Sequence, residues 1–166
     1  MSGSLIDDES WAQVGTEISR GVGTVVKKEF QRWAAAVKDR NPLYFDADYA
    51  RAQGYRDVIM PPMYIGQITQ GVHDLDRLRP DGIPLGDGAG DIALPRTPRR
   101  LAGGEDITFH EPIYHGDVVT AVRVAESLEQ KEGRSGPFVM LRTRVTYTRQ
   151  DGGLLAEAFG SMIAKP

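Results

Sequence analysis

Four segments in the last third of the chain alternate apolar and polar side chains, and this feature constrains the possible folds most strongly. They cover Asp106 to His110, Val118 to Leu128, Phe138 to Tyr147 and Leu154 to Ile163. Within the third segment, Val139, Leu141 and Val145 alternate with Arg142 and Arg144. Such alternation is typical of a half-buried strand, and glycine-containing turns separate the segments. The pattern predicts an antiparallel sheet with one apolar and one polar face.

The earlier part of the chain carries helical patterns. Residues 27–38 form one, with Phe30, Trp33, Ala34 and Val37 on a single stripe. Asp46 is a candidate N-cap of a second helix that stops at Gly54. A third helix is expected to follow Pro61-Pro62 and to run from residue 63 to 75, and a long loop is expected from about residue 79 to 104. Helices followed by meandering strands indicate an α+β domain.

Length and composition place the chain among ordinary globular proteins. At 166 residues we expect a flexible tail over residues 1–10 and a single domain over residues 11–166. The net charge of −3 argues against a nucleic-acid surface, which needs a basic excess. The absence of cysteine excludes disulfides and thiolate chemistry. With no apolar run of membrane-spanning length, we expect a soluble, cytoplasmic protein.

The turn from Asp39 to Asp46 is the candidate functional site. Pro42 forbids helix continuation, so a carboxylate (Asp39), an amide (Asn41) and a phenol (Tyr44) can converge on one small volume. The alternative is ordinary turn chemistry, in which Asp and Asn side chains satisfy nearby backbone groups.

Three stretches together resemble the MaoC-like (R)-specific enoyl-CoA hydratase and 3-hydroxyacyl-thioester dehydratase family. They are FQRWAAAVKDRNPLYFDADYARAQGY, VIMPPM and EDITFHEPIYHGDVV. The resemblance runs from about residue 15 to the end. It implies a hot-dog fold, in which a curved antiparallel sheet wraps around a central helix, and an acyl-CoA or acyl carrier protein thioester as substrate, with no separate cofactor. It also implies a homodimer or a heterodimer with a catalytic MaoC-type hot-dog chain.

The resemblance assigns Asp39, Asn41 and Tyr44 to the catalytic positions of the family, where Asp and His bracket the water that adds to the enoyl double bond. The family motif reads Gly-Asp-x-Asn-Pro-Leu-His, whereas this chain has Lys38 before Asp39 and Tyr44 in place of the histidine. A tyrosine near pKa 10 is a poor base at neutral pH. The family also has a His-Gly pair opening the central helix, where this chain has Pro61-Pro62, which lacks N–H groups. These departures indicate the acyl-binding half of a hydratase with a degenerate active site.

A cluster of arginines is the candidate site for coenzyme A. Arg96, Arg99 and Arg100 lie close together in sequence, near Arg77 and Arg79. Arginine recognises phosphate well through its planar fork. The alternative is a solvated loop whose arginines balance neighbouring aspartates.

The remaining polar motifs favour no further site. His110 and His115 are expected to be structural, and His73 has no second histidine at metal-ligand spacing, so no metal is expected. The glycine-rich stretch from residue 86 to 91 lacks the Gly-Lys-Ser/Thr of a phosphate loop.

Three functions stay open from the sequence. The first is a hot-dog subunit of an enoyl-thioester hydratase or 3-hydroxyacyl dehydratase, in fatty-acid, steroid or polyketide metabolism, beside a partner with an intact motif. The second is a self-sufficient hydratase that uses Asp39. The third is a hot-dog thioesterase, in which Asp39 or Glu111 would activate water.

Overall fold

The computed structural model describes residues 4–70, 75–78, 80 and 92–166. The α-helices are α1 (Asp8–Ala12), α2 (Lys27–Ala36), α3 (Ala47–Ala52) and α4 (Ile65–Ile68), and the 3-10 turns are η1 (Pro42–Tyr44), η2 (Pro62–Tyr64) and η3 (Leu75–Arg77). The strands are β1 (Glu17–Thr24), β2 (Arg99–Phe109), β3 (Val118–Gly133), β4 (Gly136–Arg149) and β5 (Leu154–Lys165).

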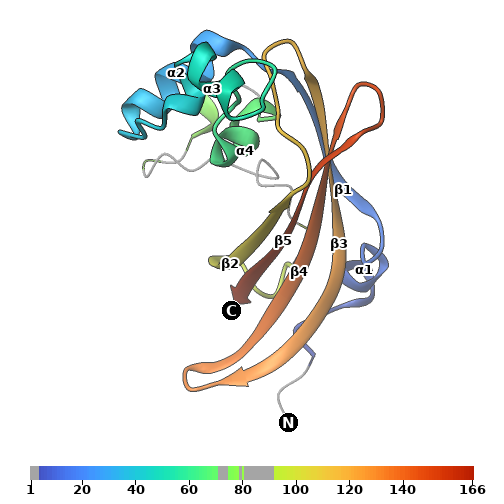
Figure 1. Cartoon of the computed structure of the whole chain (residues 1–166). Coiled ribbons are helices and arrows are strands. Elements are labelled where there is room, and N and C mark those ends of the chain that lie inside the picture. The colour runs from blue at the N-terminus through green and yellow to red at the C-terminus, as the bar shows by residue number, and fades with distance from the viewer. Residues whose placement is uncertain (1–3, 71–74, 79, 81–91) are drawn as a thin grey trace.

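All five strands form one antiparallel sheet in the order β1-β3-β4-β5-β2. The sheet is long and curved, and α2, α3 and α4 gather at one end of it (Figure 1). Strands β1 and β2 are its edges, because each pairs with a single neighbour. The predicted α+β class and antiparallel sheet are confirmed.

The two faces of the sheet differ as the alternation predicts. On β4, Val139, Leu141 and Val145 are buried, whereas Arg142 and Arg144 point to the opposite, outer face. Two apolar clusters cover the inner face. The first packs the helices on the sheet and includes Val25, Phe30, Val58, Met60, Ile65, Ile113, Val119, Val145, Tyr147 and Leu155. The second includes Ile6, Ile92, Leu94, Ala125, Leu128, Val139, Leu141 and Ala164.

The central helix is shorter than predicted. The predicted helix over residues 63–75 starts as the 3-10 turn η2, and α4 ends at Ile68. Glycine and β-branched residues around this point are weak helix formers. A side chain on Gly23 would overlap the carbonyl oxygen of Ile68, so the glycines of β1 let the end of α4 approach the sheet backbone. Residues 71–74 lie outside the described residues.

The other two helices match the prediction closely. Helix α2 runs from Lys27 to Ala36, with Phe30 and Ala34 buried. Asp46 caps α3, since its Oδ1 accepts hydrogen bonds of 3.0 Å from two backbone N–H groups of the first turn. The chain leaves α3 at Gly54, where φ is +92°.

The predicted loop over residues 79–104 is too long, because β2 begins at Arg99. Residues 99–102 pair in register with the last residues of β5, and a bulge follows between Ala102 and Gly104. This pairing joins residues far apart in the sequence, and Gly103 and Gly104 have low strand propensity, so the sequence alone does not predict a strand here. Residues 79 and 81–91 of the loop, and the glycine-rich stretch within it, lie outside the described residues.

The N-terminal segment contacts the sheet within the described residues. Ile6 belongs to the second apolar cluster, and Ser10 in α1 is buried and donates a 2.9 Å hydrogen bond to the carbonyl of Ala93. The division into a tail over residues 1–10 and a domain over residues 11–166 stays a prediction. Among the helices that the structure describes, none is long and apolar enough to cross a membrane.

Candidate functional site

The turn after α2 depends on one residue in the left-handed region. Lys38 has a φ of +62°, which reverses the chain just after the end of the helix at Ala36. The backbone N–H of Asp39 then donates to the carbonyl of Ala34 at 2.9 Å. Left-handed backbone at this position is the conformation that glycine adopts without strain, which accounts physically for the glycine in the motif that Lys38 replaces.

Asp39 and Asn41 hold the turn together through backbone contacts. The Asp39 carboxylate accepts from the N–H of Asn41 at 3.2 Å, and the Asn41 side-chain oxygen accepts from the N–H of Leu43 at 3.1 Å. Asn41 therefore acts as the N-cap of η1. Both side chains have the ordinary turn roles that the sequence left open as an alternative.

Tyr44 points into the protein rather than toward solvent. It is 6% exposed and packs with Ala34 and Ile59 in a small cluster that partly buried aromatic side chains complete. Burial, and then the negative charge of Asp39, raise the pKa of the Tyr44 phenol above its usual 10.0, and the amide of Asn41 offsets part of this rise. The structure thus brings Asp39, Asn41 and Tyr44 together, and the phenol stays protonated at neutral pH.

Pro61 and Pro62 leave the start of α4 without two backbone donors. Pro61 is buried, and Pro62 opens the 3-10 turn η2, which leads into the helix. Just before this pair, the N–H of Met60 donates to the carbonyl of Ile113 at 2.8 Å. The segment from residue 60 to 62 therefore offers no free N–H to a ligand.

An apolar pocket of about 220 Å³ lies next to the turn. Its lining residues are Tyr55, Ile59, Met60, Pro62, Phe109, His110, Glu111, Pro112 and Ile113. Tyr55 and Ile59 also pack in the cluster around Tyr44, so the pocket and this cluster share two side chains. The opposite wall, residues 109–113, continues from the end of the edge strand β2. Because its lining is largely apolar, this space is the candidate site for an acyl group, and we call it the acyl pocket below.

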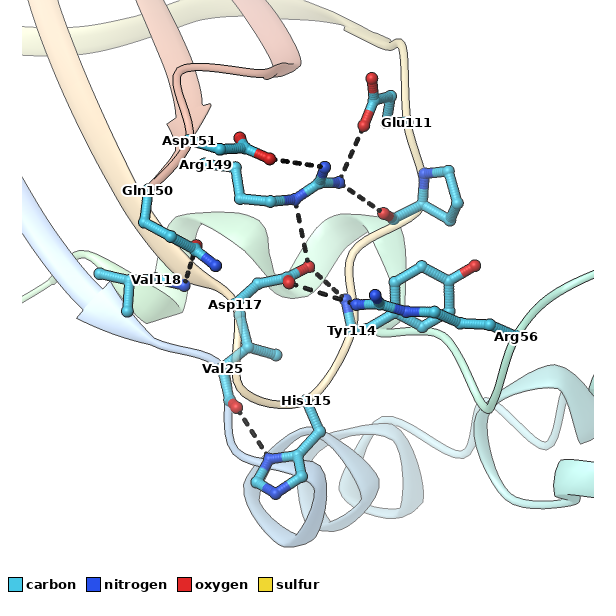
Figure 2. Close-up of polar contacts among 11 residues, drawn as sticks. Val25, Arg56, Glu111, Tyr114, His115, Asp117, Val118, Arg149, Gln150 and Asp151 are labelled. Atoms are coloured by element: carbon cyan, nitrogen blue, oxygen red, sulfur yellow. Dashed lines mark hydrogen bonds and ion pairs between the residues drawn. The ribbon is translucent and has the colours of Figure 1, made fainter.

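A charged network that the sequence did not predict lies behind this wall (Figure 2). The side chain of Arg149, at the end of β4, lies 2.9 Å from the Glu111 carboxylate and 3.5 Å from that of Asp117. Asp117 is 4% exposed and also meets Arg56 at 3.4 Å. The Arg56 guanidinium stacks over the ring of Tyr114, 4.1 Å from its centre. In the sequence, only the stretch EDITFHEPIYHGDVV of the family resemblance, which contains Glu111 and Asp117, pointed to this region.

The structure places the three predicted coenzyme A arginines at the far end of β2. Arg99 and Arg100 begin this strand, and Phe109 ends it at the acyl pocket. At about 3.3 Å per residue, the strand places Arg99 roughly 33 Å from Phe109. Each guanidinium contacts a backbone carbonyl: Arg96 that of Ser4 at 2.5 Å, Arg99 that of Pro166 at 2.6 Å, and Arg100 that of Thr97. The structure does not bring these arginines beside the turn, and their role in binding coenzyme A stays a prediction.

The two histidines that the structure describes, His110 and His115, contact residues outside the turn. His115 Nδ1 is 3.0 Å from the carbonyl oxygen of Val25, and His110 Nε2 is 3.4 Å from the Glu157 carboxylate. His73 is outside the described residues. Among the part of the chain that is described, no group of three His, Cys, Asp or Glu side chains is arranged to hold a metal ion. That no metal or cofactor is needed stays a prediction.

Comparison with known proteins gives one family match and several relatives. Residues 12–158 match the family model described as "FAS1-like, dehydratase domain region". A UPF0336 protein of Saccharopolyspora erythraea is 26% identical over 141 residues, which are 85% of this chain and 81% of that protein. The 3-oxo-4,17-pregnadiene-20-carboxyl-CoA hydratase alpha subunit of Mycobacterium tuberculosis is 35% identical over 99 residues, which are 52% of this chain but only 30% of that subunit.

Among solved structures, a chain of the ChsH1-ChsH2 complex from Mycobacterium tuberculosis superposes with a TM-score of 0.74. The match covers 95% of this chain and 89% of that chain at 23% identity. At this identity the match establishes the shared fold, and the predicted hot-dog architecture is confirmed.

Proposed function

We propose that this chain is an acyl-binding hydratase subunit without its own catalytic base. The premise is that it belongs to the FAS1-like dehydratase-domain-region family, the MaoC-like hot-dog hydratases and dehydratases of acyl-CoA metabolism. In this proposal a partner hot-dog chain with an intact Gly-Asp-x-Asn-Pro-x-His motif supplies the acid–base pair. These acid–base residues direct the water oxygen to C3 of a trans-2-enoyl thioester and a proton to C2.

The burial of Tyr44 is the observation that carries the proposal. A general base must lose its proton near neutral pH and must reach the reacting water. The phenol of Tyr44 fails the first condition, because burial and the charge of Asp39 raise its pKa, and its ring packs with Ala34 and Ile59 in an apolar cluster. Asp39 alone is a carboxylate whose side chain already accepts a hydrogen bond from the turn.

The second support is the loss of thioester polarisation at the start of α4. Prolines at positions 61 and 62 cannot donate the hydrogen bonds that polarise a carbonyl. Removing one such donor from an oxyanion site lowers turnover by about 10²–10³-fold. A site that lacks both the base and these donors can still bind an acyl group.

The third support is the position of the acyl pocket beside an unpaired sheet edge. Strand β2 pairs only with β5, and its described residues are largely exposed. Exposed edges favour pairing with another strand. A chain that paired along β2 would lie against the pocket wall at Phe109, so both chains would line the acyl group. The Mycobacterium tuberculosis relative named as a hydratase alpha subunit and the ChsH1-ChsH2 complex are consistent with such a partner.

The test measures hydration of crotonyl-CoA by the purified chain, by each candidate partner from the same genome, and by each co-expressed pair. We expect little turnover from the chain alone, and a heteromeric mass with activity above the sum of the separate chains. The matched variant is Asp39→Asn, which keeps the turn's acceptor but removes its charge and should leave the activity of the pair nearly unchanged.

Robust turnover by the chain alone, abolished by Asp39→Asn, would replace the proposal with the self-sufficient hydratase. Release of free coenzyme A from the acyl thioester, without hydration, would instead indicate the thioesterase. A chain that forms only a homodimer and raises no partner's activity would end the subunit proposal.

A further inference from the structure

Strand pairing holds the start of the acyl pocket wall, and side chains hold the part that follows. The N–H groups of His110 and Glu111 both donate to the carbonyl of Leu155, at 2.9 and 3.4 Å, and after Glu111 the chain leaves the sheet. Pro112 has no N–H to donate. The next regular backbone bond of the wall is the 2.8 Å contact between the Met60 N–H and the Ile113 carbonyl. Between these two anchors, the wall depends on what contacts the Glu111 side chain and the Pro112 carbonyl.

Arg149 provides those contacts from behind the wall. Its Nη2 lies 2.9 Å from the Glu111 carboxylate and donates to the Pro112 carbonyl oxygen at 3.3 Å (Figure 2). The side chain of Arg149 is 17% exposed, so water competes little with these contacts. The arginine is itself fixed at the end of β4, where its backbone N–H donates to the carbonyl of Gly153 at 2.8 Å.

Asp117 fixes Arg149 and the second end of the loop. Its carboxylate accepts from the Tyr114 N–H at 2.9 Å and lies 3.5 Å from Nε of Arg149. That Nε is buried and has no hydrogen-bond partner among the described residues, so Asp117 holds the guanidinium by charge. The ring of Tyr114 in turn packs in the cluster that contains Tyr44. Asp117 and Arg149 thus connect the pocket wall, through Tyr114, to the cluster around Tyr44 in the turn.

We propose that Arg149 and Asp117 are positioning residues of the acyl pocket, which fix the wall at residues 109–113 and thereby set how tightly the pocket holds an acyl group. This inference rests on the proposed acyl-binding function. Arg149 and Asp117 act through Glu111, Pro112 and Tyr114, and neither needs to touch the ligand.

The test compares Arg149→Met with Arg144→Met. Arg144 is the matched control, because it lies on the same strand and also pairs with a carboxylate, that of Glu126 at 2.8 Å, but on the outer face of the sheet. Calorimetry on the full chain, with its partner if one is needed, measures the affinity for hexanoyl-CoA and for free coenzyme A. The ratio of these two affinities isolates the acyl contribution.

We expect Arg149→Met to lower this ratio about tenfold, within the range by which residues outside a site change its affinity, and Arg144→Met to leave it unchanged. Arg149→Lys keeps the charge but loses the planar fork, so it should restore the ratio only in part. Hydrogen exchange at the Met60 amide is the second readout, since this N–H bonds to the wall. It should exchange faster in Arg149→Met, relative to global unfolding, than in Arg144→Met.

An unchanged affinity ratio and unchanged Met60 exchange in a folded Arg149→Met chain would overturn the positioning role. If Arg149→Met does not fold, Asp117→Asn, which keeps the acceptor for Tyr114, decides by the same two measurements. A wild-type chain that binds hexanoyl-CoA no better than free coenzyme A would instead contradict the proposed function, and the exchange at Met60 would still decide whether the network holds the wall.

Discussion

Replacing Lys38 with glycine should stabilise the protein. Lys38 adopts a φ of +62°, its side chain is exposed, and it lies two residues after the last residue of α2. Left-handed backbone costs an L-residue with a Cβ roughly 1–2 kcal/mol. Glycine avoids this cost but gives the unfolded chain more freedom, which removes about 0.4–1 kcal/mol of the gain. The expected net stabilisation of Lys38→Gly is about 0.5–1 kcal/mol.

The measurement is urea unfolding with the midpoint and slope fitted together, supported by thermal melting. For a chain of this size, about 1 kcal/mol corresponds to a rise of roughly 2–4 °C in Tm. Lys38→Ala is the matched control, because it removes the long side chain but keeps Cβ, and so should not gain this stability. If Lys38→Gly is no more stable than Lys38→Ala, the argument from backbone strain is wrong.

Three further predictions follow from the fold and the site. Gly23→Ala should destabilise the protein by about 1–3 kcal/mol, because the new Cβ would overlap the carbonyl oxygen of Ile68, and an unchanged urea midpoint would contradict this close approach. The pKa of the Tyr44 phenol is higher in the folded protein than its unfolded value of 10.0. Its contribution to the free energy of unfolding is therefore fully present below pH 10.0 and is lost as the pH rises through the folded pKa. In alkaline unfolding titrations, Tyr44→Phe should lose less stability than the wild type. The double substitution Arg99→Ala, Arg100→Ala should weaken acyl-CoA binding at low salt in calorimetry, whereas unchanged affinity would contradict a role of these arginines in binding coenzyme A.

Elements set by local chemistry could be predicted from the sequence. The alternation on β4 separates buried Val139 and Leu141 from outward-facing Arg142 because successive side chains of a strand point to opposite faces. Asp46 caps α3 because its short carboxylate reaches the first N–H groups of the helix. Neither feature depends on distant residues.

Features set by distant partners could not be predicted. The start of β2 at Arg99 depends on pairing with Lys165, and glycines near its bulge gave no strand signal. The network behind the acyl pocket joins positions 56, 117 and 149, which no local pattern relates. The burial of the Tyr44 side chain could not be predicted either, because it packs against Ile59, which follows α3 in the sequence.

The structure separates two reasons why the turn could keep its polar residues. Asp39 accepts the N–H of Asn41, and Asn41 accepts the N–H of Leu43, so both side chains satisfy backbone donors that a proline-interrupted turn would otherwise leave unpaired. These bonds form whether or not the turn performs chemistry. The presence of Asp39 and Asn41 therefore does not argue for catalysis. Tyr44 discriminates between the two, since a general base must lose its proton near neutral pH, whereas burial and the charge of Asp39 raise the pKa of this phenol above its usual 10.0.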